Sequence, residues 1–206
     1  MSITRLSILP SLVLGAIACL ICLAACAGGE PLPPVDPAAA KDLDAFFLRF
    51  RQRVQEGHTD SIPLYLSRES LNWIDDMRRA SRSEPPKYLA ERPFYEILSV
   101  LSLRVERRLN PGFDDRPKAI LDKLVIQGGP VRKSLLKTEL AESKVRGERG
   151  EIGLREAPNV PVFFFVRENR EWKFHLMKSL PLILQGAESL ARTRKPTRLD
   201  QAIFIL

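Results

Sequence analysis

The sequence predicts an α+β fold in which helices come first and an antiparallel sheet follows. Between residues 37 and 109, apolar side chains recur at three- and four-residue spacing, the period of amphipathic helices. From residue 120 to residue 177 the pattern changes to short apolar runs and alternation, separated by turn-forming residues, which is typical of strands. Helices followed by consecutive strands favour an antiparallel sheet packed on those helices.

The first helix has clear signals at both ends. Asp36 can cap it, Pro37 suits the first helical position, and Gly57 ends it. A short apolar segment, residues 61–66, follows. The expected buried face of the helix consists of Leu43, Phe46, Phe47, Phe50 and Val54.

Two further helices are expected before the sheet. Ser67 can cap the second, which breaks at residues 83–86, and Pro93 opens the third, which stops at residues 110–112. Their expected buried side chains are Leu71, Ile74 and Met77 in the second, and Phe94, Ile97, Leu98, Leu101, Val105 and Leu109 in the third.

The second half of the chain predicts strands and a C-terminal extension. The expected strands are residues 120–126, 131–141, 144–155, 160–166 and 172–177. The run at 160–166 is wholly apolar, so we expect it to be central in the sheet, and a turn at 168–170 leads from it into the last strand. A helix over 179–192 and an apolar strand or plug over 202–206 complete the chain.

The N-terminal segment has the pattern of an export signal that ends at a cysteine. Arg5 supplies the positive charge, and residues 6–23 are almost wholly apolar. Leu23-Ala24-Ala25-Cys26 then places two small residues before a cysteine. This segment resembles the processing site of bacterial lipoproteins. The resemblance implies that Cys26 becomes the N-terminus, carries a diacylglyceryl thioether and an N-acyl chain, and binds membrane lipid through them.

The competing interpretation is an uncleaved transmembrane helix. The apolar run of about 18 residues is at the lower limit for spanning a bilayer. The basic flank expected after such a helix is replaced by Ala27-Gly28-Gly29-Glu30-Pro31, which favours the lipoprotein. Cys19 and Cys22 match the processing pattern less well than Cys26. In many Gram-negative lipoproteins, which this site resembles, Asp after the cysteine marks retention at the inner membrane. Ala27 follows Cys26 here, so for an organism with an outer membrane the resemblance implies the outer membrane, on its periplasmic side, rather than the inner membrane.

Four regions follow from these observations. Several prolines favour an extended spacer after the cysteine. The expected regions are a signal peptide over residues 1–25, a proline-rich tether over 26–37, an α+β domain over 38–180, and a C-terminal helix and apolar tail over 181–206.

Composition narrows the function classes. All three cysteines lie at or before Cys26, so the body is expected to fold without a disulfide, a cysteine nucleophile or a thiolate metal ligand. The net charge of +7 falls to +6 when Arg5 is removed with the signal. Because the basic residues are dispersed and the protein is exported, we expect no nucleic-acid partner and interpret the charge as solvated helix faces. The alternative is attraction to anionic lipid head groups or acidic envelope polymers.

Residues 160–176 resemble the closing hairpin of the NTF2-like superfamily. Members have a strand, an acidic-Asn-Gly turn, and then Trp-Lys with an apolar residue. Residues 168–174 match this pattern, with Arg170 where glycine is usual, and Tyr65-Leu66-Ser67 also resembles the superfamily. The resemblance covers roughly residues 38–180. It implies a strongly bent sheet wrapped around helices, which forms a cone with an apolar pocket.

The NTF2-like fold hosts both enzymes and binding modules, so it does not assign a function. The candidate pocket residues are Tyr65, Trp73, Tyr95 and His175, and no catalytic residue, metal ligand or cofactor is expected. Asp75-Asp76 and Asp114-Asp115 are interpreted as a solvated helix face and a turn. The sequence therefore predicts a non-enzymatic module that binds an envelope protein or a small apolar ligand. The alternatives are a pocket enzyme of the isomerase or hydrolase kind, and a scaffold whose cone is filled by its own side chains.

Overall fold

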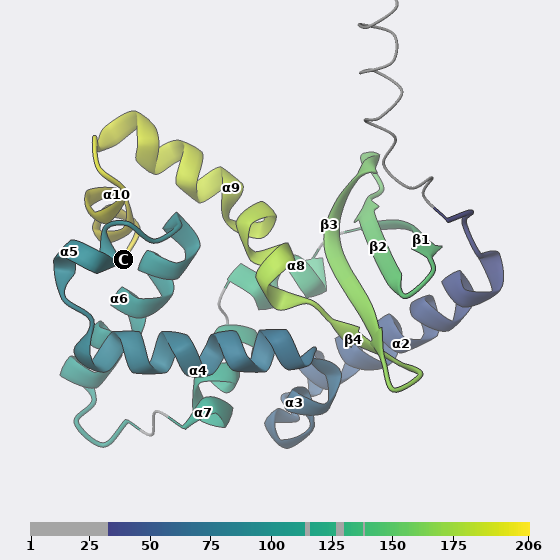
Figure 1. Ribbon diagram of the computed structural model, residues 1–206, viewed down its shortest axis with the longest axis horizontal. Helices are drawn as coiled ribbons and strands as arrows, with labels where there is room; N and C mark the ends of the chain where they lie inside the picture. The colour runs from purple at the N-terminus through teal and green to yellow at the C-terminus, as the bar shows by residue number, and fades with distance from the viewer. Residues whose placement is uncertain (1–32, 114–115, 127–129, 138) are drawn as a thin grey trace, which may run out of the picture. The chain divides into compact units, whose positions relative to one another are not determined.

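The computed structural model describes residues 33–113, 116–126, 130–137 and 139–206. The processing site Leu23–Cys26 and the Asp114-Asp115 turn lie outside these residues. Val35–Leu206 forms one compact unit, shown in Figure 1. Among its described helices, none combines the length and the apolar character that a membrane span requires.

The first helix, α2, begins and ends where the sequence predicts. It covers Pro37–Glu56, and Asp36 Oδ1 accepts hydrogen bonds from the backbone N–H of Ala38 (2.9 Å) and Ala39 (3.1 Å). Gly57 ends the helix in the left-handed conformation, with φ of 75°. The predicted face is buried: Leu43, Phe46, Phe47, Phe50 and Val54, joined by Ala39.

The second and third predicted helices are also confirmed, but Val105 and Leu109 of the third, which were expected to be buried, are 44% and 70% exposed. The two helices are α4 (Arg68–Ser83), whose Ser67 cap accepts a hydrogen bond from the Ser70 N–H, and α6 (Phe94–Leu109). Three short elements join them to their neighbours: a 3-10 turn at Thr59–Ser61, α3 (Ile62–Tyr65) and α5 (Pro86–Leu89).

The segment between α6 and the sheet is helical, so the strands predicted at 120–126 and 131–141 are wrong. It contains α7 (Pro117–Leu121), one π-helical turn (Asp122–Ile126) and α8 (Pro130–Lys137). Short apolar runs fit a buried helix as well as a buried strand, and here the apolar residues also recur four apart. The buried residues at that spacing are Leu121 and Val125, and Val131 and Leu135.

Four strands form an antiparallel meander in the order β1-β2-β3-β4. The strand predicted at 144–155 is divided by a turn at Gly147, whose φ is 58°. The run at 160–166 lies in β3, and its pairing with β2 and β4 confirms that it is central. The strands are β1 (Leu140–Arg146), β2 (Arg149–Leu154), β3 (Ala157–Glu168) and β4 (Glu171–Phe174).

The predicted turn at 168–170 is confirmed, but the strand after it is shorter than predicted. Asn169 and Arg170 have φ of 50° and 67°, the combination that suits a tight two-residue hairpin. β4 ends at Phe174, so His175 and the two residues after it are not in a strand, because α9 begins at Leu176.

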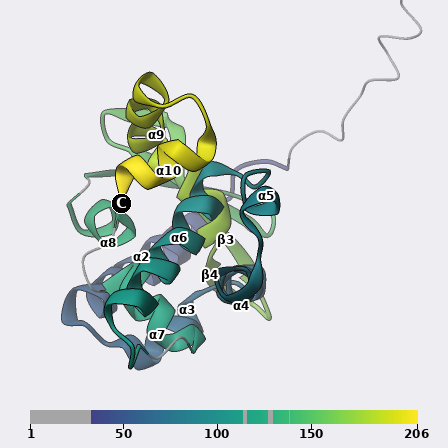
Figure 2. The ribbon, with the colours of Figure 1, turned by 90° about the vertical axis from the view of Figure 1, so that its left-hand side faces the viewer.

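The C-terminal extension is helical throughout. α9 covers Leu176–Arg194, and α10 covers Arg198–Ile205 with Thr197 as its cap. The tail predicted as a strand or plug is therefore a helix, which packs against α6 and α9 (Figures 1 and 2).

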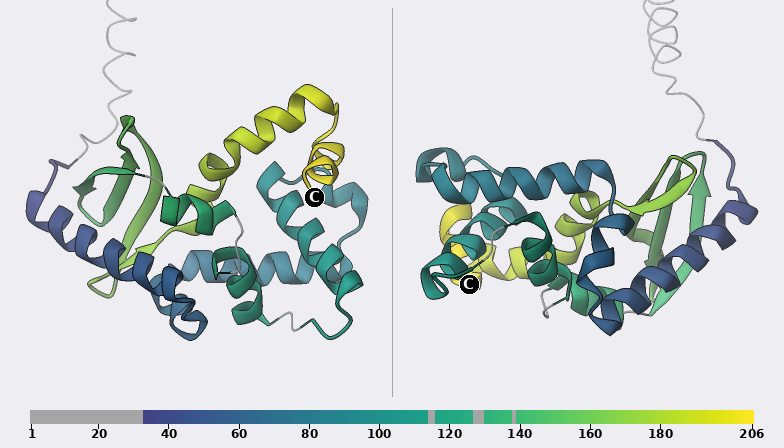
Figure 3. Two further views of the ribbon diagram at one scale, coloured as in Figure 1. Left: turned by 180° about the vertical axis from the view of Figure 1, so that it is seen from behind. Right: turned by 90° about the horizontal axis from the view of Figure 1, so that it is seen from below.

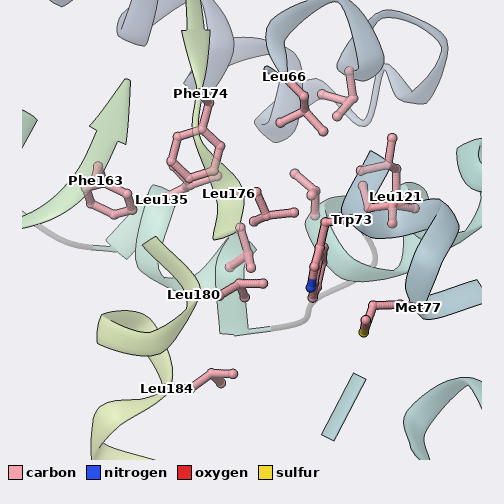
Figure 4. Close-up of a cluster of buried hydrophobic side chains, with 14 of the residues drawn as sticks. Leu66, Trp73, Met77, Leu121, Leu135, Phe163, Phe174, Leu176, Leu180 and Leu184 are labelled. Carbon is pink, nitrogen blue, oxygen red and sulfur yellow. The ribbon is translucent and has the colours of Figure 1, made fainter. Parts of the chain in front are cut away.

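One contiguous apolar core joins these elements. α2 lies along the sheet, and register irregularities opposite Gly153, whose extra residues lie in β3, bend that strand. Figure 3 shows α2 beside the strands and α4 beside α6. Figure 4 shows side chains of the sheet meeting those of α4 and α9. The structure thus confirms the α+β class, with helices packed on a bent antiparallel sheet and a helical C-terminal extension.

Candidate functional site

Aromatic rings fill the space between α2 and the sheet. Phe46, Phe47 and Phe50 of α2 meet Phe163 and Phe165 of β3 and Phe174 of β4, and all six side chains are buried. Ring centroids lie 5.8 Å apart for Phe47–Phe165 and 5.4 Å apart for Phe50–Phe174. Side chains therefore occupy the region in which the NTF2-like resemblance implies an apolar pocket.

Tyr65 belongs to this aromatic filling. Its ring comes from α3 and lies 5.5 Å from the rings of both Phe46 and Phe50, stacked on the second at 26°. Tyr65 is half-buried and closes one side of the cluster.

Trp73 and Tyr95 lie in a second place, where α4 packs on α6. Their rings are 6.1 Å apart, and Trp73 Nε1 donates a hydrogen bond of 3.3 Å to Glu96 Oε1. Burial, assisted by the nearby Glu96 carboxylate, raises the pKa of Tyr95. A phenol with a raised pKa is a weaker acid, so Tyr95 stays neutral under ordinary conditions.

Three carboxylates surround Arg92, which directly precedes Pro93 and α6. Its Nε and Nη2 each donate to Glu84 at 2.8 Å, and its Nη1 donates to Glu96 (2.8 Å) and Asp76 (3.0 Å). The bonds to Glu84, followed by those to Glu96 and Asp76, raise the pKa of Arg92 further above its usual value. All three acids are thus engaged by one permanent cation, an arrangement that stabilises helix packing rather than proton transfer.

His175 lies in a third place, the junction between β4 and α9. It is only 7% exposed, and its Nε2 lies 3.0 Å from Glu69 Oε2. Its Nδ1 has no hydrogen-bond partner within the described part of the chain.

The serines near His175 hold backbone groups. Ser70 Oγ accepts from the Leu176 N–H at 2.9 Å, and Ser179 Oγ accepts from the Phe164 N–H at 3.0 Å and donates to the His175 carbonyl. No serine hydroxyl is bonded to the His175 ring among the residues that the structure describes. Among the described residues, the junction therefore holds no bonded serine–histidine pair of the kind that activates a serine nucleophile.

The four candidate residues thus lie in three separate places and line no common cavity. The structure has a hollow of about 540 Å³ at the end of α6, lined by Glu106, Phe113 and Lys123 among others, and one of about 400 Å³ between α2 and β1. None of the four candidates lines either hollow. Across the described ranges, no three His, Cys, Asp or Glu side chains gather closely enough to hold a metal ion.

Comparison with known proteins adds no relative. No protein-family model, curated protein or solved structure matches this chain. A functional assignment can therefore draw only on the chain's own residues.

Proposed function

We propose that this chain is a lipid-anchored protein of the bacterial envelope whose NTF2-like body binds a protein partner through its outer surface. The outer membrane, on its periplasmic side, is the proposed location. The aromatic filling between α2 and the sheet carries this proposal, because a small apolar ligand or substrate would have to displace rings such as Phe50 and Phe174. The filling favours a protein-binding scaffold over both a small-ligand carrier and a pocket enzyme.

The anchor is tested by lipid labelling in a bacterial host. The full chain should incorporate a clickable fatty acid, and Cys26→Ser should abolish the incorporation. Cys22→Ser is the matched control, because it removes a neighbouring cysteine and should leave labelling intact. Labelling that persists in Cys26→Ser would contradict the anchor.

The filled interior is tested with an apolar fluorescent probe such as N-phenylnaphthylamine. The purified mature chain should show no saturable increase in probe fluorescence at the interior. Phe174→Ala should create one, because deleting a buried ring leaves a cavity lined by apolar side chains. Leu64→Ala, at an exposed position on α3, is the control and should leave the signal unchanged. The filled interior would be contradicted if the wild-type chain bound the probe saturably and Phe174→Leu changed that binding. This result would revive the pocket alternatives.

Partner binding is tested by photo-crosslinking in intact cells. A crosslinking residue at Leu48, exposed beside the hollow between α2 and β1, should give one discrete higher-mass product. Leu64 again serves as the comparison position. Identical product patterns from both positions would indicate nonspecific proximity and contradict a defined docking surface at Leu48.

A further inference from the structure

The end of the unit formed by α9 and α10 combines exposed apolar side chains with unpaired cations. The exposed apolar residues here are Leu190, Ile203, Phe204 and Leu206, which is the largest such group in any short stretch of the described chain. Figure 2 looks onto this end, with α10 crossing in front of α6.

α10 is apolar on its outer side as well as its inner side. Ala202 and Gln201 are buried, and Leu199 and Ile205 pack against the core. Ile203 and Phe204 point away from that contact and, with the terminal Leu206, remain exposed. A helix that is apolar on its solvent side is typical of a surface that is covered in use.

Basic residues border this apolar surface. Arg194, Lys195 and Arg198 are exposed in and after the last turn of α9. In the described chain, Arg194 and Lys195 form no ion pair, and the nearest acid in sequence, Asp200, is engaged by the Thr197 hydroxyl at the α10 cap. The surface therefore presents apolar side chains next to a local excess of positive charge.

We propose that the α9–α10 surface, defined by Leu190, Arg194, Lys195, Arg198, Ile203, Phe204 and Leu206, docks on an anionic lipid bilayer. Ile203 and Phe204 enter the headgroup region, while Arg194 and Lys195 bind lipid phosphates, the combination that holds amphipathic helices at a membrane interface. This inference rests on the proposed lipid anchor, which places a bilayer beside the domain.

The test places a single fluorescent label on the full, membrane-attached chain. The body contains no cysteine of its own, so Phe204→Cys introduces a unique site in it, and Leu64→Cys provides a matched exposed apolar position elsewhere. Both variants carry Cys19→Ser and Cys22→Ser, and each is labelled with an environment-sensitive dye. They are reconstituted in vesicles of phosphatidylglycerol and phosphatidylcholine that contain a brominated lipid as quencher.

The label at 204 should shift to the blue and be quenched by the brominated lipid, whereas the label at 64 should show neither effect. Each basic residue near an anionic surface contributes about fivefold, so Arg194→Gln with Lys195→Gln should lower the docked-to-undocked ratio about 25-fold. Replacing the anionic vesicles by vesicles of phosphatidylcholine alone should lower the docked-to-undocked ratio of the unchanged surface to a similar extent.

Two results would overturn the docking proposal. One is equal quenching at 204 and 64. The other is a blue shift at 204 in vesicles that the brominated lipid does not quench, which would assign the surface to a protein contact. Attachment of the dye to Cys26 distinguishes failure of the anchor from failure of docking. A Cys26 thiol that reacts with the dye is not acylated, so the anchor proposal fails. The comparison of the labels at 204 and 64 still decides the docking proposal.

Discussion

Gly153 lies where β2 passes closest to the backbone of β3. A Cβ atom there would lie 2.9 Å from the Pro158 carbonyl oxygen and 3.0 Å from the Val160 carbonyl oxygen. Because backbone cannot move aside as a side-chain end can, Gly153→Ala should lower the free energy of unfolding by about 1–3 kcal/mol. Urea denaturation followed by circular dichroism measures the change.

Gly186 provides the opposite case for the same substitution. It lies inside α9, and a Cβ atom there would meet no atom within 4 Å. Gly186→Ala should therefore raise the free energy of unfolding by about 0.5–1 kcal/mol, since alanine loses less conformational entropy in a helix. Equal effects of the two substitutions would contradict the close approach at Gly153.

The Tyr95 phenol should ionise at a higher pH in the folded chain than in the unfolded chain. Its raised pKa means that, as pH rises past about 10, the unfolded chain releases the phenol proton before the folded chain does. The contribution of neutral Tyr95 to the free energy of unfolding is therefore fully present below about pH 10. It is lost as pH rises toward the pKa of Tyr95 in the folded chain.

Absorbance at 295 nm measures tyrosinate formation directly. In Tyr95→Phe the late phase of this titration should disappear. A titration curve that loses only its early phase would show that Tyr95 is not the perturbed group.

Arg92 links α4 and its C-cap to α6 through the carboxylates of Asp76, Glu84 and Glu96, and its removal should leave these charges facing one another. The Arg92 side chain is 23% exposed and its partners Glu84 and Glu96 are 15% and 13% exposed, so solvent screens them weakly. Arg92→Met should cost about 3 kcal/mol of unfolding free energy, as expected when one partner of a largely buried ion network is lost.

The matched control for Arg92 is Arg79 on α4. Its side chain is 64% exposed and pairs with Asp75 at 3.3 Å and with Asp76 at 3.7 Å. Arg79→Met should change stability by no more than about 0.5 kcal/mol, because exposed pairs contribute little. Losses of similar size in both variants, measured by urea denaturation, would mean that the Arg92 network is no stronger than a surface pair.

Local chemistry explains which elements could be predicted from the sequence. Asp36, Gly57 and Ser67 define helix ends because caps act through neighbouring backbone groups, and Asn169-Arg170 defines a turn for the same reason. The strands predicted at 120–126 and 131–141 failed because tertiary packing, not local pattern, decides the conformation of a short apolar run.

The candidate site was less predictable for a related reason. Arg92 meets Asp76 across 16 residues, and His175 meets Glu69 across 106, so neither contact leaves a spacing pattern in the chain. The sequence predicted that the phenylalanines are buried, but their helix and strand spacing fits both a packed core and the wall of a pocket, so the filled interior was only one of the alternatives.

The domain should depend on its aromatic core and not on disulfides. All cysteines lie at or before Cys26, so a reducing agent should leave the melting temperature unchanged. Phe174 lies within ring contact of Phe50, Phe163 and Phe165, which joins β4 to α2 and β3.

Phe174→Ala should therefore lower the free energy of unfolding by about 3–5 kcal/mol, through lost apolar burial and the cavity that remains. Phe174→Leu keeps most of the volume and should cost less than about 1.5 kcal/mol. Because the core is one contiguous cluster, far-ultraviolet and aromatic circular dichroism should report the same midpoint in urea for each variant. Separate midpoints for the two signals in the wild-type chain would mean that parts of the unit unfold independently and that the core does not couple them.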